Sequence, residues 1–280
     1  ASLLANSNGT RGFITYGYYS LSIEYSGRDG DNTTGFGYTG FNTLDVASPV
    51  MGQAEVRRLL SEAEAQLSPK SVEGKFDGKL LVAPGCLDNF LHYAISLGTS
   101  DSALIEKQSP WLDKLNTKVA DEKLTVTANP FHKSIVAAGR FNGDGYLSEI
   151  QPVIERGTLV SYQLSQYGAL KTGNERAKST NSYIIEPGNT PLAELIASID
   201  DGVLINQFSG GSPSPAGDFS GVAKMSFRIK NGKIAEALTE TMISGNLFAM
   251  LQNIDGISSE TVEDGGGSAP WIVFNGITVS

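Results

Sequence analysis

Aromatic and β-branched residues form the first apolar runs of the chain, and turn-forming residues separate them. Residues 11–25 contain such a run, bounded by glycine, and predict one long strand. Residues 28–32, Arg-Asp-Gly-Asp-Asn, have the composition of a turn, and residues 35–41 predict a second strand that returns along the first. This segment is therefore expected to form a β-hairpin.

A helical spacing of apolar residues follows the hairpin. Ser48-Pro49 is a typical helix start, because serine caps the helix and proline suits its first turn. Five apolar residues then fall on one helix face: Val56, Leu59, Leu60, Ala63 and Leu67. The pattern ends at Ser68-Pro69. The sequence predicts one amphipathic helix that opens at Ser48-Pro49 and packs its apolar face against a core.

A buried strand and a short helix come next. Residues 79–84 predict the strand, Pro84-Gly85 forms a turn, and residues 87–97 predict a short amphipathic helix. A helix that directly follows a strand and a turn is a frequent place for active-site residues. His92 lies on this helix and is one of two histidines in the chain.

The rest of the chain alternates strands with short helices. The expected elements are, in order, a strand over 124–127, a hairpin over 151–155 and 158–162, a helix over 191–198, a strand over 202–206, a loop over 208–215, a hairpin of 219–229 with 233–238 across Asn231-Gly232, a helical turn over 245–251, and strands over 270–274 and 277–279. The fold class expected from this order is α+β, with mostly antiparallel β-sheets and short helices.

Composition limits the partners and the compartment. The net charge of −9 repels phosphate backbones, so direct binding of nucleic acid is not expected. No apolar run approaches the roughly 18 residues of a membrane helix, and no secretory signal is visible. The single cysteine, Cys86, cannot form an intrachain disulfide and suits a reducing compartment, so a cytoplasmic location is expected. From the abrupt start at Ala1, we expect a truncated or processed chain whose N-terminal part is missing.

Few residues are available for metal or nucleophile chemistry. A zinc hydrolase needs about three protein ligands drawn from His, Cys, Asp and Glu. His92, His132 and Cys86 could supply them only if the fold gathered all three. His132 lies in an expected loop, where an exposed polar role is the simpler interpretation. Packing or hydrogen bonding is likewise the simpler interpretation of His92.

The C-terminal part of the chain carries a specific series of segments. In order, they are Gly202-Val-Leu-Ile-Asn-Gln-Phe-Ser-Gly-Gly211, Gly217-Asp-Phe-Ser220, Ile229-Lys-Asn-Gly-Lys-Ile234, Ile243-Ser-Gly-Asn-Leu-Phe-Ala-Met-Leu251, Ala269-Pro270 and Val279-Ser280. This series resembles the C-terminal domain of the TldD/PmbA family, also called modulators of DNA gyrase. The resemblance covers about residues 72–280, and residues 8–70 look like the end of that family's central region. The expected division is therefore a remnant of the central region over 1–70 and a C-terminal domain over 71–280.

The resemblance implies what the residues around His92 have lost. The active subunit of the family, TldD, is a zinc peptidase with a His-Glu-x-x-x-His motif shortly after a strand and a Pro-Gly pair. With Pro84-Gly85 as the reference, the first motif histidine falls on His92, the glutamate on Tyr93 and the second histidine on Leu97. A further cysteine ligand of the family has no counterpart in residues 265–270. The chain is thus similar to the PmbA/TldE branch, and zinc is expected only in a catalytic partner.

The first hypothesis is a non-catalytic subunit of a TldD/TldE-type zinc metallopeptidase that acts in peptide maturation or degradation. Its expected partners are a TldD-like catalytic subunit or a second copy of itself, together with an extended peptide substrate. Glycine lets a backbone approach closely, so two segments are candidates for binding that peptide or a partner: Phe208-Ser209-Gly210-Gly211 and Gly265–Gly267. Tight turns explain these glycines equally well. Two alternatives stay open: an active hydrolase with an unrecognised site, for example His92 with Cys86, and a pure peptide-binding module.

Overall fold

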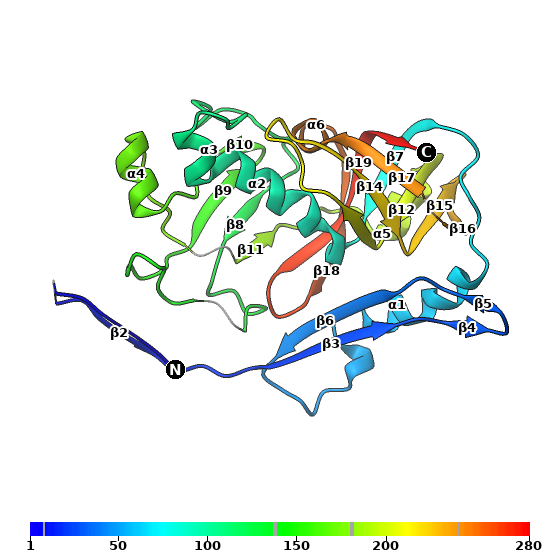
Figure 1. Ribbon diagram of the computed structural model, residues 1–280, viewed down its shortest axis with the longest axis horizontal. Helices are drawn as coiled ribbons and strands as arrows, with labels where there is room; N and C mark the ends of the chain where they lie inside the picture. The colour runs from blue at the N-terminus through cyan, green and yellow to red at the C-terminus, as the bar shows by residue number, and fades with distance from the viewer. Residues whose placement is uncertain (8, 137–138, 180–181, 240) are drawn as a thin grey trace.

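The computed structural model describes residues 1–7, 9–136, 139–179, 182–239 and 241–280 (Figure 1). Most of its described strands join one mixed sheet of 13 strands. These are β7 (Phe76–Val82), β8 (Val126–Ala128), β9 (Gln151–Glu155), β10 (Thr158–Leu159), β11 (Tyr183–Ile185), β12 (Asp201–Ile205), β13 (Gln207–Gly210), β14 (Asp218–Lys224), β15 (Ser226–Lys230), β16 (Lys233–Leu238), β17 (Thr241–Asn246), β18 (Ile254–Glu263) and β19 (Ser268–Val279). The sheet is antiparallel except where β19 pairs with β11 and β12 pairs with β7. The expected α+β class is confirmed.

Side chains of the central strands divide between two hydrophobic cores, because successive residues of a strand point to opposite faces. In β7, Leu80 and Val82 belong to the larger core, whereas Leu81 belongs to the smaller one. In β19, Phe274 and Val273 divide in the same way. All five side chains are buried, so these strands lie inside the sheet with both faces covered.

Short helices cover the two faces of the sheet. They are α2 (Leu91–Thr99), α3 (Asp101–Ile105), α5 (Leu192–Ala197) and α6 (Leu247–Gln252), while a further helix, α4 (Gln166–Thr172), packs against α3. Helices α2, α3 and α6 contribute buried apolar residues to the larger core, and α5 contributes Leu195 to the smaller one. A 3₁₀ segment, η3 (Pro84–Asn89), connects β7 to α2. The expected helix after Pro84-Gly85 is therefore confirmed, but its first part is 3₁₀.

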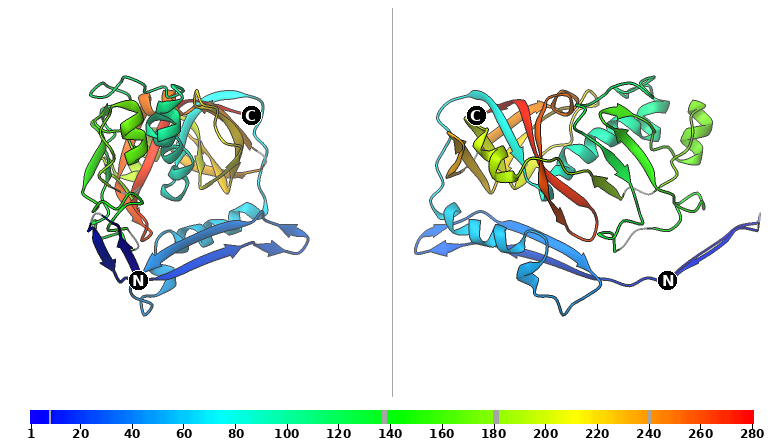
Figure 2. Two further views of the ribbon diagram at one scale, coloured as in Figure 1. Left: turned by 60° about the vertical axis from the view of Figure 1, so that its left-hand side comes forward. Right: turned by 180° about the vertical axis from the view of Figure 1, so that it is seen from behind.

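The N-terminal segment forms separate two-stranded ribbons. Strands β1 (Ser2–Ala5) and β2 (Arg11–Ile14) pair with each other, as do β3 (Tyr19–Tyr25) and β6 (Gly37–Thr43), and the short β4 (Arg28–Asp29) and β5 (Asn32–Thr33). The β3–β6 ribbon crosses beneath the body that holds the large sheet, and the β1–β2 hairpin extends to one side (Figures 1 and 2). The expected hairpin is confirmed, but the single strand over 11–25 is wrong, because residues 15–18 separate two strands that pair with different partners.

The helix after the ribbon starts later than its capping pair predicts. Ser48-Pro49 leads into a 3₁₀ turn, η1 (Val50–Gly52), and α1 (Val56–Ala63) follows before a second 3₁₀ segment, η2 (Glu64–Leu67). Ala54 has a left-handed backbone, φ 45°, which interrupts the helix before Val56. Val56, Leu59 and Ala63 are buried, so the predicted apolar face is confirmed.

Three expectations for the C-terminal half are wrong. The expected loop over 208–215 begins as strand β13, which pairs with β14. The expected strand over 219–229 is two strands, because Met225, φ 48°, redirects the chain between β14 and β15. The last two expected strands are one strand, β19, whose pairing with β7 shifts register between Phe274 and Ile277. The predicted Asn231-Gly232 turn is confirmed, with positive φ at both residues.

Candidate functional site

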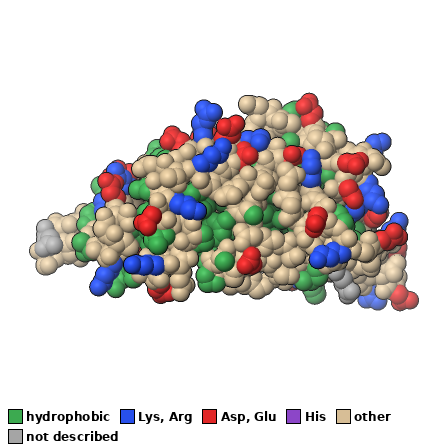
Figure 3. Space-filling view, turned by 90° about the horizontal axis from the view of Figure 1, so that it is seen from above, with side chains coloured by type: hydrophobic (Ala, Val, Ile, Leu, Met, Phe, Trp, Pro, Cys, Tyr) green, Lys and Arg blue, Asp and Glu red, His purple; other side chains and the backbone are tan. Residues whose placement is uncertain are grey.

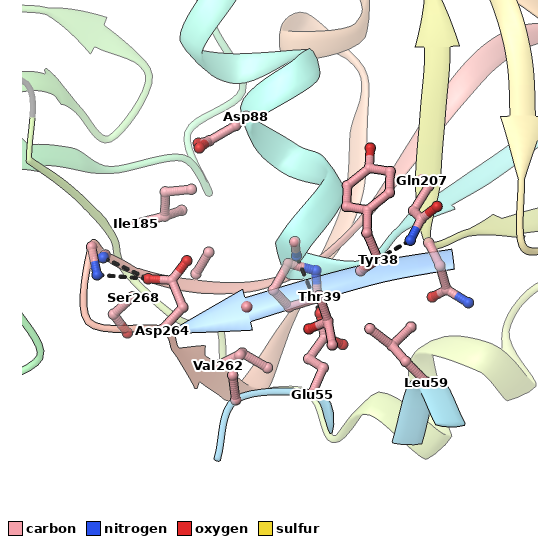
Figure 4. A pocket seen from close by; sticks show the side chains of 18 of the residues that line it. Tyr38, Thr39, Glu55, Leu59, Asp88, Ile185, Gln207, Val262, Asp264 and Ser268 are labelled. Carbon is pink, nitrogen blue, oxygen red and sulfur yellow. Dashed lines mark hydrogen bonds between the residues drawn. The ribbon is translucent and has the colours of Figure 1, made fainter. Parts of the chain in front are cut away.

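A cavity with a volume of about 490 Å³ lies between the β3–β6 ribbon and the body (Figure 4). Its walls come from β6, the start of α1, the η3–α2 segment, β11, the β12–β13 junction and the β18–β19 turn. Among the lining residues are Tyr38, Thr39, Gly40, Glu55, Asp88, His92, Tyr183, Asn206, Gln207, Asp264, Gly266 and Gly267. The N-terminal ribbon is thus one wall of the site.

Two hydrogen bonds hold β6 over the cavity, one toward each end. Gln207 Nε2 donates to the carbonyl oxygen of Tyr38 at 2.8 Å, and Asn42 N donates to the carbonyl oxygen of Asp264 at 2.7 Å. At the second contact Gly265, φ +82°, lies so close to Asn42 that a methyl group there would overlap the Asn42 carbonyl. The β18–β19 turn therefore fits the ribbon only with glycine at this position.

An ion-pair network fixes α1 beside the cavity. The Arg58 guanidinium pairs with Glu55 and with Glu62, and it also donates to Asn206 Oδ1 at 2.9 Å. Asn206 Nδ2 in turn donates to Glu62 Oε2 at 2.8 Å and to the Met225 carbonyl at 2.9 Å. Because the side chains of Glu55 and Arg58 are only 6% and 26% exposed, this network connects the helix to the body largely out of solvent.

Two carboxylates and an imidazole lie at the other side of the cavity. The pKa of the Asp88 carboxyl is raised, mainly because the cavity walls remove part of its hydration. Nearby His92 acts to lower this pKa, and nearby Asp264 acts to raise it. Asp264 Oδ1 accepts hydrogen bonds from Gly266 N at 2.8 Å and Gly267 N at 2.9 Å. The ring of Tyr183 lies 5.9 Å from that of His92, and burial followed by the charge of Asp88 raises the pKa of its hydroxyl.

The degenerate motif positions point in different directions. His92 lines the cavity, whereas Tyr93 is 40% exposed and does not line it. Leu97 is partly buried and packs against the larger core. Neither a phenol nor an isobutyl group replaces the carboxylate and imidazole of a zinc peptidase. Within the described ranges, no group of three His, Cys, Asp or Glu side chains has the arrangement of a metal site. The residues present do not fit a catalytic zinc ion.

The other candidate residues lie outside the cavity lining. Cys86 is fully buried, and burial raises the pKa of its thiol, which disfavours the nucleophilic thiolate. His132 is half-buried, with Nδ1 2.7 Å from Ser134 Oγ, and is not the exposed residue that the sequence predicts. Of the candidate segment Phe208, Ser209, Gly210 and Gly211, none lines the cavity. Phe208 instead packs against Phe90 and Phe219.

The sequence indicates only part of this site. His92 and the glycines 265–267 are singled out by motif and composition, and His92, Gly266 and Gly267 do line the cavity. Sequence reasoning misses Glu55, Asp88, Gln207 and Asp264. Asp88 precedes His92 by one helical turn, which is a signal that could have found it. The other three come from segments that meet only in the folded chain.

Comparison with known proteins places residues 76–280 in one family model, described as the PmbA/TldA metallopeptidase C-terminal domain. A metalloprotease of Methanothermobacter thermautotrophicus is 29% identical over 202 residues, which cover 67% of this chain and 43% of the relative. The chain therefore spans about half the length of the curated relatives it matches.

Two solved structures share the fold. A candidate modulator of DNA gyrase from Bacteroides thetaiotaomicron superposes with a TM-score of 0.85 at 28% identity, covering 98% of this chain and 62% of that chain. TldE from Thermococcus kodakarensis superposes with a TM-score of 0.84 at 21% identity, covering 99% and 66%. Both matches include the N-terminal ribbons as well as the large sheet.

Proposed function

Since the chain belongs to the PmbA/TldD metallopeptidase family, we propose that it serves as a non-catalytic, peptide-binding subunit of a TldD/TldE-type zinc metallopeptidase. One observation carries this proposal. The cavity presents His92, but the positions of the missing motif groups carry Tyr93, which faces solvent, and Leu97, which packs into the core. A catalytic zinc ion would supply a bound water that attacks the peptide carbonyl, and a carboxylate would take its proton. The described chain offers no such set of groups around His92.

The free edge of β6 supports binding of an extended peptide. In an antiparallel pair, alternate residues direct both backbone groups to the same side. Tyr38 and Asn42 use backbone groups to bond the body, away from β3, so the N–H and C=O of Gly40 also point away from β3 and toward the cavity. Neither group of Gly40 bonds to a described residue on that side. A peptide that adds along this edge would pair with them.

The N-terminal ribbons support the proposed assembly with a TldD-like subunit or with a second copy. Leu3, Phe13 and Phe36 are each at least 70% exposed. Large apolar side chains that a folded chain leaves in water mark surfaces where another protein binds. We also propose that residues 1–70 act as a unit distinct from 71–280, because none of their described strands pairs with the large sheet.

Two further parts of the proposal concern partners and location. On the face in Figure 3, Lys and Arg side chains are interspersed with Asp and Glu rather than gathered into one basic patch, which supports the absence of direct nucleic-acid binding. Across the described residues, no helix has the length and apolarity to cross a membrane. A reducing compartment such as the cytoplasm is proposed from the single buried cysteine.

The test is co-expression with a TldD-like protein. We expect a mixed complex whose zinc content and chelator-sensitive peptidase activity both require the partner's intact motif. A partner in which the motif glutamate is replaced by glutamine is the control, and its complex should assemble but not cleave. Cleavage by the chain alone that is lost on chelation and on His92→Ala would overturn the non-catalytic assignment.

A further inference from the structure

We propose that the end of the cavity formed by Asp88 and Asp264 is a cation-binding subsite, which selects peptides that place an ammonium or guanidinium group there. This inference rests on the proposed peptide-binding function and adds a chemical preference to it. The subsite is separate from the α1 network at the other side of the cavity, where Glu55 already pairs with Arg58. Figure 4 shows Asp88 and Asp264 on the same side of the cavity, away from Gln207.

The charge of the lining residues favours a cation. Among described residues, the lining contains the carboxylates of Glu55, Asp88 and Asp264 and no lysine or arginine. Arg58 compensates Glu55 from outside the lining, so two carboxylates keep an uncompensated charge. His92 is the one basic side chain of this described lining. A cavity lined by one sign of charge concentrates ligands of the opposite sign.

Both carboxylates have unused acceptor capacity. Asp88 forms no hydrogen bond or ion pair with any described residue, and Asp264 uses only Oδ1, which accepts from two glycine N–H groups. Both residues line this cavity, and Asp264 also raises the pKa of Asp88, as a nearby negative charge does. A cationic group at this end of the cavity would be attracted by both charges.

An independent observation at the opposite end of the cavity also points to a donor-rich ligand. Gln207 is 4% exposed and lines the cavity, and its amide nitrogen reaches across to Tyr38. Its Oε1 atom is buried and accepts no hydrogen bond within the described chain. Buried acceptors are almost always paired, so this atom is available to a hydrogen-bond donor that enters the cavity.

The ribbon sets the distance between the two ends. Gln207 bonds to Tyr38 and Asp264 bonds to Asn42, four residues further along β6. At about 3.3 Å per residue this separation is roughly 13 Å, the length of four to five extended residues. A short peptide along β6 would therefore reach from Gln207 to the carboxylates. Its positive group could be a free α-amino terminus or a Lys or Arg side chain.

Calorimetric binding of short synthetic peptides to the intact chain tests the inference. Peptides of about five residues are enough to span β6. Four are compared: an alanine peptide with a free amino terminus, an acetylated peptide with one lysine, an acetylated neutral peptide, and an acetylated peptide with one glutamate. We expect at least one cationic peptide to bind about tenfold or more tightly than the neutral one, the scale of one charge-assisted hydrogen bond. The glutamate peptide should bind most weakly.

Asp88→Asn and Asp264→Asn, alone and combined, remove the charge and keep the shape. Asp264→Asn retains an oxygen for the N–H groups of Gly266 and Gly267, so the turn should persist. Asp200→Asn changes net charge equally on an exposed acid that does not line this cavity. The combined variant should lose the preference for cations and still bind the neutral peptide, whereas Asp200→Asn should retain it.

The outcomes separate this inference from the proposed function. Equal binding of cationic, neutral and acidic peptides, or a preference that survives in the combined variant, would overturn the cation subsite and leave peptide binding standing. Failure of every peptide to bind would overturn both. If only the free amino terminus confers the preference, the ligand group is the α-ammonium; if only lysine does, it is a side chain. Either result supports the subsite.

Discussion

The close approach of Gly265 to Asn42 makes the attachment of the N-terminal ribbon measurable. Gly265 has φ +82°, and a methyl group there would overlap the Asn42 carbonyl oxygen. A side chain in the left-handed region costs about 1 to 2 kcal/mol. Displacing β6 would also lose the Asn42 N to Asp264 O hydrogen bond, worth about 1 kcal/mol. Gly265→Ala should therefore lower the free energy of unfolding by about 2 to 3 kcal/mol.

Gly276→Ala is the matched control, because Gly276 has φ +77° and no described atom lies within 4 Å of the place that a methyl group would take. It should lose only about 1 to 2 kcal/mol from the backbone conformation. Urea unfolding measures the two free energies, and limited proteolysis of the native proteins reports whether the ribbon detaches. Equal destabilisation of the two variants, with equal protection of residues 19–43, would refute the close approach as the reason for glycine at 265.

Three further predictions test other parts of the fold. Arg58→Ala should destabilise the chain by about 3 kcal/mol because it leaves the buried Glu55 carboxylate without its cationic partner, whereas Arg57→Ala, at an exposed neighbour, should change thermal unfolding little. Gly98→Ala should cost about 1 to 3 kcal/mol, since the methyl would overlap the buried Trp111 indole; unchanged tryptophan fluorescence and stability would contradict it. Burial, and after it the charge of Glu62, raises the pKa of the Tyr25 hydroxyl to about 12. The free energy of unfolding that this group contributes is therefore present below pH 10 and should fall as the pH rises toward 12. Unfolding measured against pH should show a smaller loss for Tyr25→Phe and an unchanged loss for Tyr19→Phe.

The elements that local pattern specifies could be predicted from the sequence. The apolar run of β7, the helical spacing of Val56, Leu59 and Ala63, and the Asn231-Gly232 turn each contain their own signal within a few residues. Elements whose own residues carry no apolar pattern could not. Strand β18 is rich in polar residues and forms because β19 pairs with it, with two shifts of register. The break between β14 and β15 at Met225 also has no signal in the sequence, since the residues on either side of it continue one strand-like pattern.

The site follows the same rule. His92 could be found because the resemblance to a family motif marks its helix. The same motif identified Tyr93 and Leu97 as the two positions without zinc-binding groups. Asp264 and Gln207 could not be found, because acids and amides occur throughout the chain and nothing local distinguishes these two. Their importance comes from the ribbon, to which Gln207 bonds across 169 positions of sequence. Only a folded chain shows that they lie at opposite ends of one strand.

The ribbon therefore connects the two proposals through a single physical dependence. Gly40 presents a free strand edge only because Tyr38 and Asn42 are held by the body, and Asp264 meets that edge only because the turn at Gly265 fits beneath Asn42. A variant that loosens the ribbon, such as Gly265→Ala, should weaken the binding of all peptides together, whatever their charge. A variant that removes charge, such as Asp88→Asn, should weaken cationic peptides alone. Gly265→Ala changes the position of the strand edge, whereas Asp88→Asn changes the charge of the cavity. The affinities for neutral and cationic peptides therefore distinguish the two variants.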